Sequence, residues 1–188
     1  MKSIKMLFVL LFAITLTTFA QQKEEYSTDP GYFDYSEYAQ FKNVEPKTAI
    51  HLEGPMLRAI SKMGKGKGEK ISEMIATLKL IKVNQFSVAA ADLDKTENTI
   101  SSMDKKLQSE KWDRIIKSKE KKSFSSIYVK MGEGDNYAGL FAIVMDKHDD
   151  LTIVNIVGKI DLETIGNLSE QMHLPGLGKA KADKKEKE

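Results

Sequence analysis

Cysteine is absent from all 188 residues of this chain, so neither a disulfide nor a thiolate contributes to its fold or its chemistry. Histidine occurs only as His51, His148 and His173, without the spacing of a metal site. No serine stands in a G-x-S-x-G motif. The sequence therefore predicts no catalytic residue, no metal ligand and no cofactor.

An unbroken apolar run occurs at the amino terminus. Two lysines precede the apolar residues 6–14, and a motif of small residues ends at Ala20. This order predicts a signal peptide over residues 1–20, cleaved before Gln21. The alternative is an uncleaved anchor, which is disfavoured because about 20 apolar residues are needed to span a bilayer. Without a cysteine after the cut, lipid attachment is excluded, and we expect a soluble periplasmic or secreted protein.

The charge balance disfavours a nucleic-acid partner. Lys2 and Lys5 account for two of the 29 basic residues and lie in the leader, which holds none of the 27 acidic residues. The mature chain therefore carries 27 residues of each sign, whereas nucleic-acid-binding domains usually present a net basic face. Its length is ordinary for one domain that buries most of its apolar surface.

Residues 21–45 form an aromatic-rich arm, with five aromatic residues inside the segment GYFDYSEYAQF at 31–41. One interpretation is an arm that staples onto the domain. The other is an exposed surface for a partner or a glycan, because tyrosine-rich patches suit interfaces. On the second interpretation, the candidate partner-binding residues are Tyr32, Phe33, Tyr35 and Tyr38.

Hydrophobic periodicity predicts one α+β domain over residues 46–175 and a disordered, charged tail over 176–188. Short polar turns between the last three strands indicate an antiparallel meander. We expect an antiparallel sheet of about four to six strands with helices packed mainly on one face. The expected helices are 54–63, 69–77, 95–109 and a last one capped by Asp161 and reaching Met172; the expected strands are 48–52, 78–88, 124–131, 137–145 and 151–158.

Within these elements the pattern also assigns faces. In the strand at 124–131, Ile127 and Val129 fall on one side and Phe124 and Tyr128 on the other. One face of the helix at 54–63 carries Met56, Leu57, Ile60 and Met63.

Three further segments invite a functional interpretation. The loop GKGKG at 64–68 lacks the spacing of a phosphate-binding loop and lies between two helices, which favours a connector. The loop DKHDD at 146–150 lacks the alternate spacing of a calcium loop. Trp112 begins the segment WDRII, which we interpret as core rather than as a sugar platform.

The chain resembles the DUF4252 family, a group of exported Bacteroidetes proteins without an assigned activity. Three stretches carry the resemblance: AIHLEGPMLRAISKM from Ala49, LKLIKVNQFSV from Leu78 and LFAIVMDKHDDLTIVNIVGKIDLETIGNL from Leu140. Together they span about 120 residues, from Pro46 to Met172. The resemblance implies a small envelope domain and assigns no site residue.

Two functions remain open. The first is a non-enzymatic interaction module of the periplasm or envelope, whose partner is an envelope protein. The alternative is a small-ligand-binding protein or cryptic hydrolase with a pocket between sheet and helices. Methionines suit an adaptable apolar cavity, and the candidates for its lining include Met56, Met63, Met74 and Met103.

Overall fold

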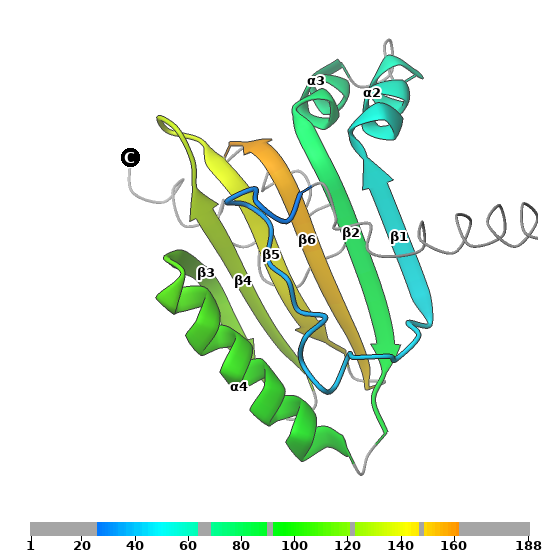
Figure 1. Cartoon of the computed structure of the whole chain (residues 1–188), viewed down its shortest axis with the longest axis vertical. Coiled ribbons are helices and arrows are strands. Elements are labelled where there is room, and N and C mark those ends of the chain that lie inside the picture. Colours follow the sequence, from blue (N-terminus) through cyan, green and yellow to red (C-terminus); the bar gives the residue numbers. More distant parts are fainter. Residues whose placement is uncertain (1–25, 64–68, 90–91, 121–122, 147–148, 162–188) are drawn as a thin grey trace, which may run out of the picture.

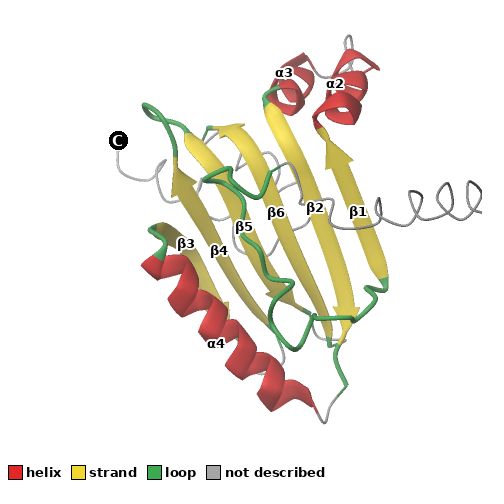
Figure 2. Ribbon diagram, viewed as in Figure 1, coloured by secondary structure: helices red, strands yellow, loops and turns green. Residues whose placement is uncertain are grey.

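The computed structural model describes residues 26–63, 69–89, 92–120, 123–146 and 149–161 (Figure 1). Its elements are β1 (Thr48–Glu53), α2 (Gly54–Met63), α3 (Glu69–Ala76), β2 (Leu78–Ser87), α4 (Leu93–Ser109), β3 (Trp112–Lys119), β4 (Phe124–Met131), β5 (Tyr137–Met145) and β6 (Asp150–Ile160) (Figure 2). The predicted leader, the loop at 64–68, the predicted last helix and the charged tail lie outside the described residues.

The six strands of this part of the chain form one antiparallel sheet in the order β1-β2-β6-β5-β4-β3. β4, β5 and β6 are consecutive neighbours, which confirms the predicted meander. β6 also pairs with β2, and β2 pairs with β1, so the antiparallel pair β1–β2 extends the sheet on the β6 side. α4 connects β2 to β3, which forms the edge opposite β1.

β3 is the strand that the sequence analysis missed. It lies at an edge, and most of its residues after Trp112 are exposed. A bulge at Ile115 also breaks its alternation, because Arg114 pairs with Tyr128 whereas Ile116 pairs with Ile127. Alternation of apolar and polar residues cannot identify this strand, because the side chains exchange faces after its first three residues. Trp112 itself is 3% exposed, which confirms its predicted place in the core.

The central strands bury side chains on both faces of the sheet. Ile127 and Val129 belong to an apolar cluster on one face, and Tyr128 belongs to the cluster on the other. This is the division that the sequence predicts for β4. Phe141 and Ala142 of β5 fall into different clusters in the same way, which explains why β5 is almost wholly apolar.

The three described helices do not share one face of the sheet. Met103 and Leu107 of α4 pack in the cluster that contains Tyr128. Leu57 of α2 and Met74 of α3 pack in the cluster of the opposite face. The expectation of helices mainly on one face is corrected accordingly. The reason lies in the connections. α2 and α3 connect two neighbouring antiparallel strands, β1 and β2, whereas α4 connects β2 to β3 at the far edge of the sheet (Figure 1).

Candidate functional site

The aromatic arm lies across the sheet on the side of α4 (Figure 1). Two of its four candidate partner-binding residues are core residues, since Phe33 is 1% and Tyr35 is 4% exposed. The ring of Phe33 meets the ring of Phe141 edge-on at 4.8 Å between centroids. Tyr32 and Tyr38 are half-buried. An exposed surface made of all four side chains is therefore not formed, because the arm completes the core of this face.

The arm is anchored by one buried amide. Asn155 on β6 is fully buried, and its Oδ1 accepts a hydrogen bond from the backbone N–H of Phe33 at 2.9 Å. Its Nδ2 donates to the carbonyl oxygens of Gly31 at 3.0 Å and Leu140 at 3.2 Å. Asn155 thus supplies the partners that the arm backbone lacks where it crosses the sheet, as buried polar groups require.

Close backbone contact explains two glycines in this region. A Cβ on Gly31 would lie 1.9 Å from the carbonyl oxygen of Ala138, and a Cβ on Gly139 would lie 2.4 Å from the carbonyl oxygen of Gly31. Both are far below van der Waals contact, so only glycine permits this approach. The arm backbone therefore rests directly on β5, and the stapling interpretation describes its position.

Two of the arm tyrosines contact polar side chains of β2. Asn84 donates to the hydroxyl of Tyr35 at 2.7 Å. The ammonium of Lys82 lies 5.8 Å from the ring centroid of Tyr32 and 5.7 Å from that of Tyr35, within the range of cation–π attraction. These contacts fix the orientation of the two rings. A role in partner binding for the half-buried Tyr32 and Tyr38 stays a prediction.

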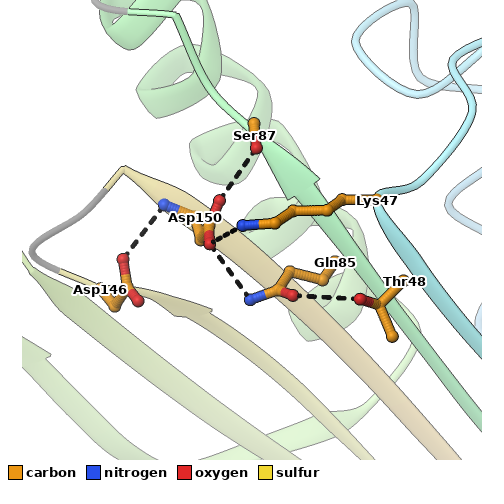
Figure 3. A network of polar contacts seen from close by, with 6 residues as sticks. All are labelled: Lys47, Thr48, Gln85, Ser87, Asp146 and Asp150. Carbon is orange, nitrogen blue, oxygen red and sulfur yellow. Dashed lines mark hydrogen bonds and ion pairs between the residues drawn. The ribbon is translucent and has the colours of Figure 1, made fainter.

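The acidic loop before β6 holds strand ends together (Figure 3). The carboxylate of Asp150 pairs with Lys47 at 2.8 Å and accepts hydrogen bonds from Ser87 at 3.0 Å and Gln85 at 3.4 Å. The carboxylate of Asp146 accepts from the backbone N–H of Asp150 at 3.1 Å. The described part of the chain contains no cluster of three potential metal ligands. The network thus joins the start of β1 to β2 and β6.

His51 is the one histidine among the described residues, and its side-chain partner is a neighbouring carboxylate. His51 lies on the exposed edge strand β1, where its Nε2 is 2.9 Å from the carboxylate of Glu53. His148 and His173 lie outside the described residues.

A pocket of about 240 Å³ lies between α4 and the β3–β4 edge of the sheet. This is the location that the ligand-binding hypothesis predicts, although the methionines named for it are elsewhere. Met145 alone among the methionines lines the pocket, whereas Met74 and Met103 are core residues and Met56 and Met63 are exposed. Methionine at helical spacing therefore did not mark the cavity.

The bulge at Ile115 decides which side chains face this pocket. Before it, Arg114 pairs with Tyr128; after it, Lys117 pairs with Ser126 and Lys119 with Phe124. Partners in an antiparallel pair share a face, so all three basic side chains lie on the Tyr128 face. An uninterrupted strand would place the two lysines on the opposite face. The bulge thus gathers three cations along one wall.

A hydrogen-bonded cluster closes one end of the pocket. The carboxylate of Asp104 on α4 accepts from the hydroxyl of Tyr128 at 2.7 Å, from Arg114 at 2.6 Å and from Gln108 at 2.8 Å. Burial by itself would raise the pKa of Asp104, but the three donated hydrogen bonds lower that pKa overall. Burial, and then the hydrogen bond to Asp104, raise the pKa of Tyr128 to about 12. The cluster therefore keeps an ionised carboxylate beside a neutral phenol.

The raised pKa of Tyr128 predicts a loss of stability in alkali. An unfolded phenol loses its proton near pH 10, whereas the folded one keeps it to about 12, so the folded state binds more protons between these values. Stability from this group is complete below pH 10 and declines as the pH rises to 12. We expect urea midpoints measured from pH 9 to 11 to fall more steeply for the wild type than for Tyr128→Phe. Parallel curves would contradict this assignment.

Serines and paired charged side chains make up much of the polar lining of the pocket. Its serines, Ser101, Ser118, Ser123 and Ser126, have no histidine beside them among its lining residues. Two of its carboxylates are engaged by other side chains, because Asp104 accepts a hydrogen bond from Tyr128 at 2.7 Å and Glu97 pairs with Lys119 at 3.1 Å. A wider depression of about 630 Å³ lies between the arm and α4, and its charged residues, Asp92 and Lys95, pair with each other at 3.1 Å.

A second surface lies at the opposite edge of the sheet. The described residues include seven exposed large apolar side chains, and five of them fall within residues 44–63. We call these five the β1–α2 surface: Val44, Ile50, Met56, Ile60 and Met63.

The four residues that the sequence places on one face of α2 are not buried together. Leu57 is 1% exposed, with Gly54 and Ser61 on the same buried side of α2, whereas Met63 is 86% exposed. Met56, Ile60 and Met63 follow one another at i, i+4 and i+7, so they form a stripe that faces solvent.

β1 adds a free backbone edge beside that stripe. Among the described strands it pairs with β2 alone, and five of its six residues are exposed. Exposed apolar side chains next to an unpaired strand edge are typical of an interaction site.

The model of a domain of unknown function, DUF4252, matches residues 38–168, which is more than two thirds of the chain. The chain belongs to this family. The resemblance stated from the sequence is thereby confirmed. No curated protein and no solved structure matches the chain.

The family match covers some of the features described above and leaves others outside. It includes the whole pocket, β1 and α2, and the buried Phe41 of the arm, but it begins after Phe33 and Tyr35, so these two buried aromatic residues precede it. Family membership carries no activity. Among the described helices of this family member, none has the length and apolar character needed to cross a membrane.

Proposed function

We propose that this member of the family is an exported, non-enzymatic interaction module of the cell envelope. Its leader motif, with two lysines, an apolar core and a small-residue site ending at Ala20, supports export and cleavage before Gln21. The single observation that carries the interaction role is the β1–α2 surface. Single exposed apolar residues are normal, but five within one short segment at a sheet edge call for a partner.

The partner that fits this surface is an envelope protein that contributes an extended strand. Strand addition uses the free N–H and C=O groups of an edge, and alternate side chains then contact the neighbouring apolar surface. On β1, Ile50 faces the same side as Val83 of β2, so every second side chain of an added strand would lie on the same face of the sheet as Ile50. The stripe on α2, directly after β1, extends the apolar contact.

The chain provides matched controls for a test of this surface. Ile50 is 43% exposed on the edge strand β1, and Ile115 is 42% exposed on the opposite edge strand β3. Met56 is 55% exposed, and Met131, at the end of β4, is 52% exposed. Each pair has the same residue type and nearly the same exposure, so a difference between its members reports position rather than hydrophobicity.

We expect a photocrosslinking amino acid at position 50, in the full chain produced in its native cell, to join one envelope protein that position 115 does not join. That protein, once identified and purified, should bind the wild type and bind Ile50→Lys and Met56→Lys at least tenfold more weakly, as for apolar anchors of an interface. Ile115→Lys and Met131→Lys should bind as the wild type does.

Two results would overturn this proposal. Equal loss of binding in the variants of both edges would show that any added charge interferes. An adduct at position 50 formed with a second copy of the chain, and dissociated by Ile50→Lys in sedimentation, would assign the surface to self-association instead.

A second candidate function, binding of a small ligand, is favoured by the pocket beside α4. Ligand sites typically combine apolar walls with a few convergent polar groups. Here Ile100, Phe124 and Met145 supply apolar contact, and Ser126 and Tyr128 supply polar atoms. Because this pocket and the β1–α2 surface lie at opposite edges of the sheet, one domain has room for both.

A further inference from the structure

We infer that the pocket between α4 and β3 binds a small amphipathic anion, a carboxylate on a short apolar body, with Lys117 as the charged contact. This inference rests on the second candidate function and names its ligand class. It follows from the distribution of charge and apolar surface over the pocket walls.

Three basic side chains of β3 line the pocket, and two of them have ion-pair partners on α4. Arg114 is held by Asp104 at 2.6 Å, and Lys119 is held by Glu97 at 3.1 Å. Lys117 lies between them on β3 and has no ion-pair partner within the described chain. Two of the three cations are therefore neutralised by α4, and one remains available.

The position of Lys117 relative to polar and apolar walls is the second step. Its register partner on β4 is Ser126, which is 4% exposed and lines the pocket, so a ligand head group near Lys117 also meets the hydroxyl of Ser126. The remaining carboxylate of the pocket belongs to Glu120, which follows the last residue of β3. It is exposed and lies beyond the strand, three residues from Lys117.

Apolar side chains from three different elements complete the pocket. Ile100 comes from α4, Phe124 from β4 and Met145 from β5, and each is partly or fully buried. A head group at Lys117 therefore leaves the body of the ligand against these three residues. The volume of about 240 Å³ equals roughly eight water molecules at their liquid volume, which suits a chain of several carbons rather than a full lipid.

Octanoate is a suitable probe, with octanol as the neutral analogue and octylamine as the cationic one. By calorimetric titration of the full mature chain, we expect octanoate to bind more tightly than both. Lys117→Gln should weaken octanoate binding about fivefold, as for a partly exposed ion pair, and leave octanol binding unchanged. Lys105→Gln, an exposed position on α4 outside the pocket lining, is the matched control and should bind octanoate as the wild type does.

A second variant tests the apolar half. Ile100→Asn should weaken octanoate and octanol to a similar degree, because it removes apolar contact and no charge.

The outcomes separate this inference from the function on which it rests. If octanoate and octanol bind equally and Lys117→Gln changes neither, the pocket binds ligands without selecting an anion, and only the ligand class is overturned. If none of the three probes binds at millimolar concentration, ligand binding by this pocket is overturned as well. Tighter binding of octylamine, or equal weakening by Lys105→Gln, would also refute the role of Lys117.

Discussion

Replacing Asn155 with leucine is expected to lower the free energy of unfolding by about 3 kcal/mol, because it leaves buried backbone groups without partners. Leucine keeps the branching of the side chain at Cγ but cannot accept from the N–H of Phe33 or donate to the carbonyls of Gly31 and Leu140. Urea unfolding followed by the fluorescence of Trp112, the single tryptophan, measures this loss.

The same substitution should also release the arm before the domain unfolds. Asn155 bonds to the arm at two backbone atoms, so its loss weakens the arm more than the sheet. We expect trypsin to cleave at the exposed Lys42 faster in Asn155→Leu than in the wild type.

The matched control for this experiment is Asn98→Leu, the same substitution at an exposed position on α4. Surface substitutions of this kind usually change stability by less than about 0.5 kcal/mol. If Asn98→Leu and Asn155→Leu were equally destabilised, the buried amide would not be the anchor of the arm.

Gly139→Ala is expected to destabilise the chain by about 3 kcal/mol or more, since backbone must move away from backbone. The new Cβ would lie 2.4 Å from the carbonyl oxygen of Gly31 and 2.5 Å from its Cα. No side-chain rotation relieves such contacts, so the arm must lift from β5. Chemical denaturation measures the effect, and trypsin cleavage at Lys42 reports the release of the arm.

A double-mutant cycle distinguishes this contact from a general intolerance of β5. Gly31→Ala alone should also be strongly destabilising, because its Cβ would lie 1.9 Å from the carbonyl oxygen of Ala138. Once Gly139→Ala has displaced the arm, adding Gly31→Ala should cost little, so the two effects are not additive. Gly134→Asn is the control, since its Cβ meets nothing within 4 Å and asparagine tolerates the φ of +62° at that turn. Additive losses would show that the two glycines act separately.

Deleting the arm would not be a clean test of partner binding. With Phe33 and Tyr35 in the core, removing the arm removes part of the fold, and a loss of partner binding would follow from unfolding. Substitutions on the β1–α2 surface avoid this problem because Ile50 and Met56 are exposed.

Local periodicity identified most of the secondary structure. The prediction of a strand at 124–131 with Ile127 and Tyr128 on opposite sides matches β4, and the helices at 54–63 and 69–77 match α2 and α3 to within a residue. Such patterns are legible because a buried face leaves the same spacing wherever the element packs. β3 was not legible, since an edge strand buries little and its bulge at Ile115 breaks the period.

The candidate sites depended far more on tertiary structure. The aromatic density of the arm was visible in the sequence, but whether those rings face a partner or the core is decided by Asn155, more than 100 residues later in the chain. The stripe on α2 was visible too, yet its exposure follows from which side of the helix meets α3 and β2. The basic wall of the pocket gave no sequence signal, because only the bulge turns Lys117 and Lys119 toward Tyr128.

By itself, the sequence determined the class of the protein: a chain without cysteine, charge-balanced over residues 21–188, with an α+β order of elements and the DUF4252 family pattern. Composition and short-range spacing suffice for these properties because each depends on residues near one another in the chain. Only the tertiary structure decided that the arm completes the core, that β1 and α2 expose an apolar surface and that α4 and β3 enclose a pocket. Exposure and proximity depend on contacts between distant segments, and no local pattern records them.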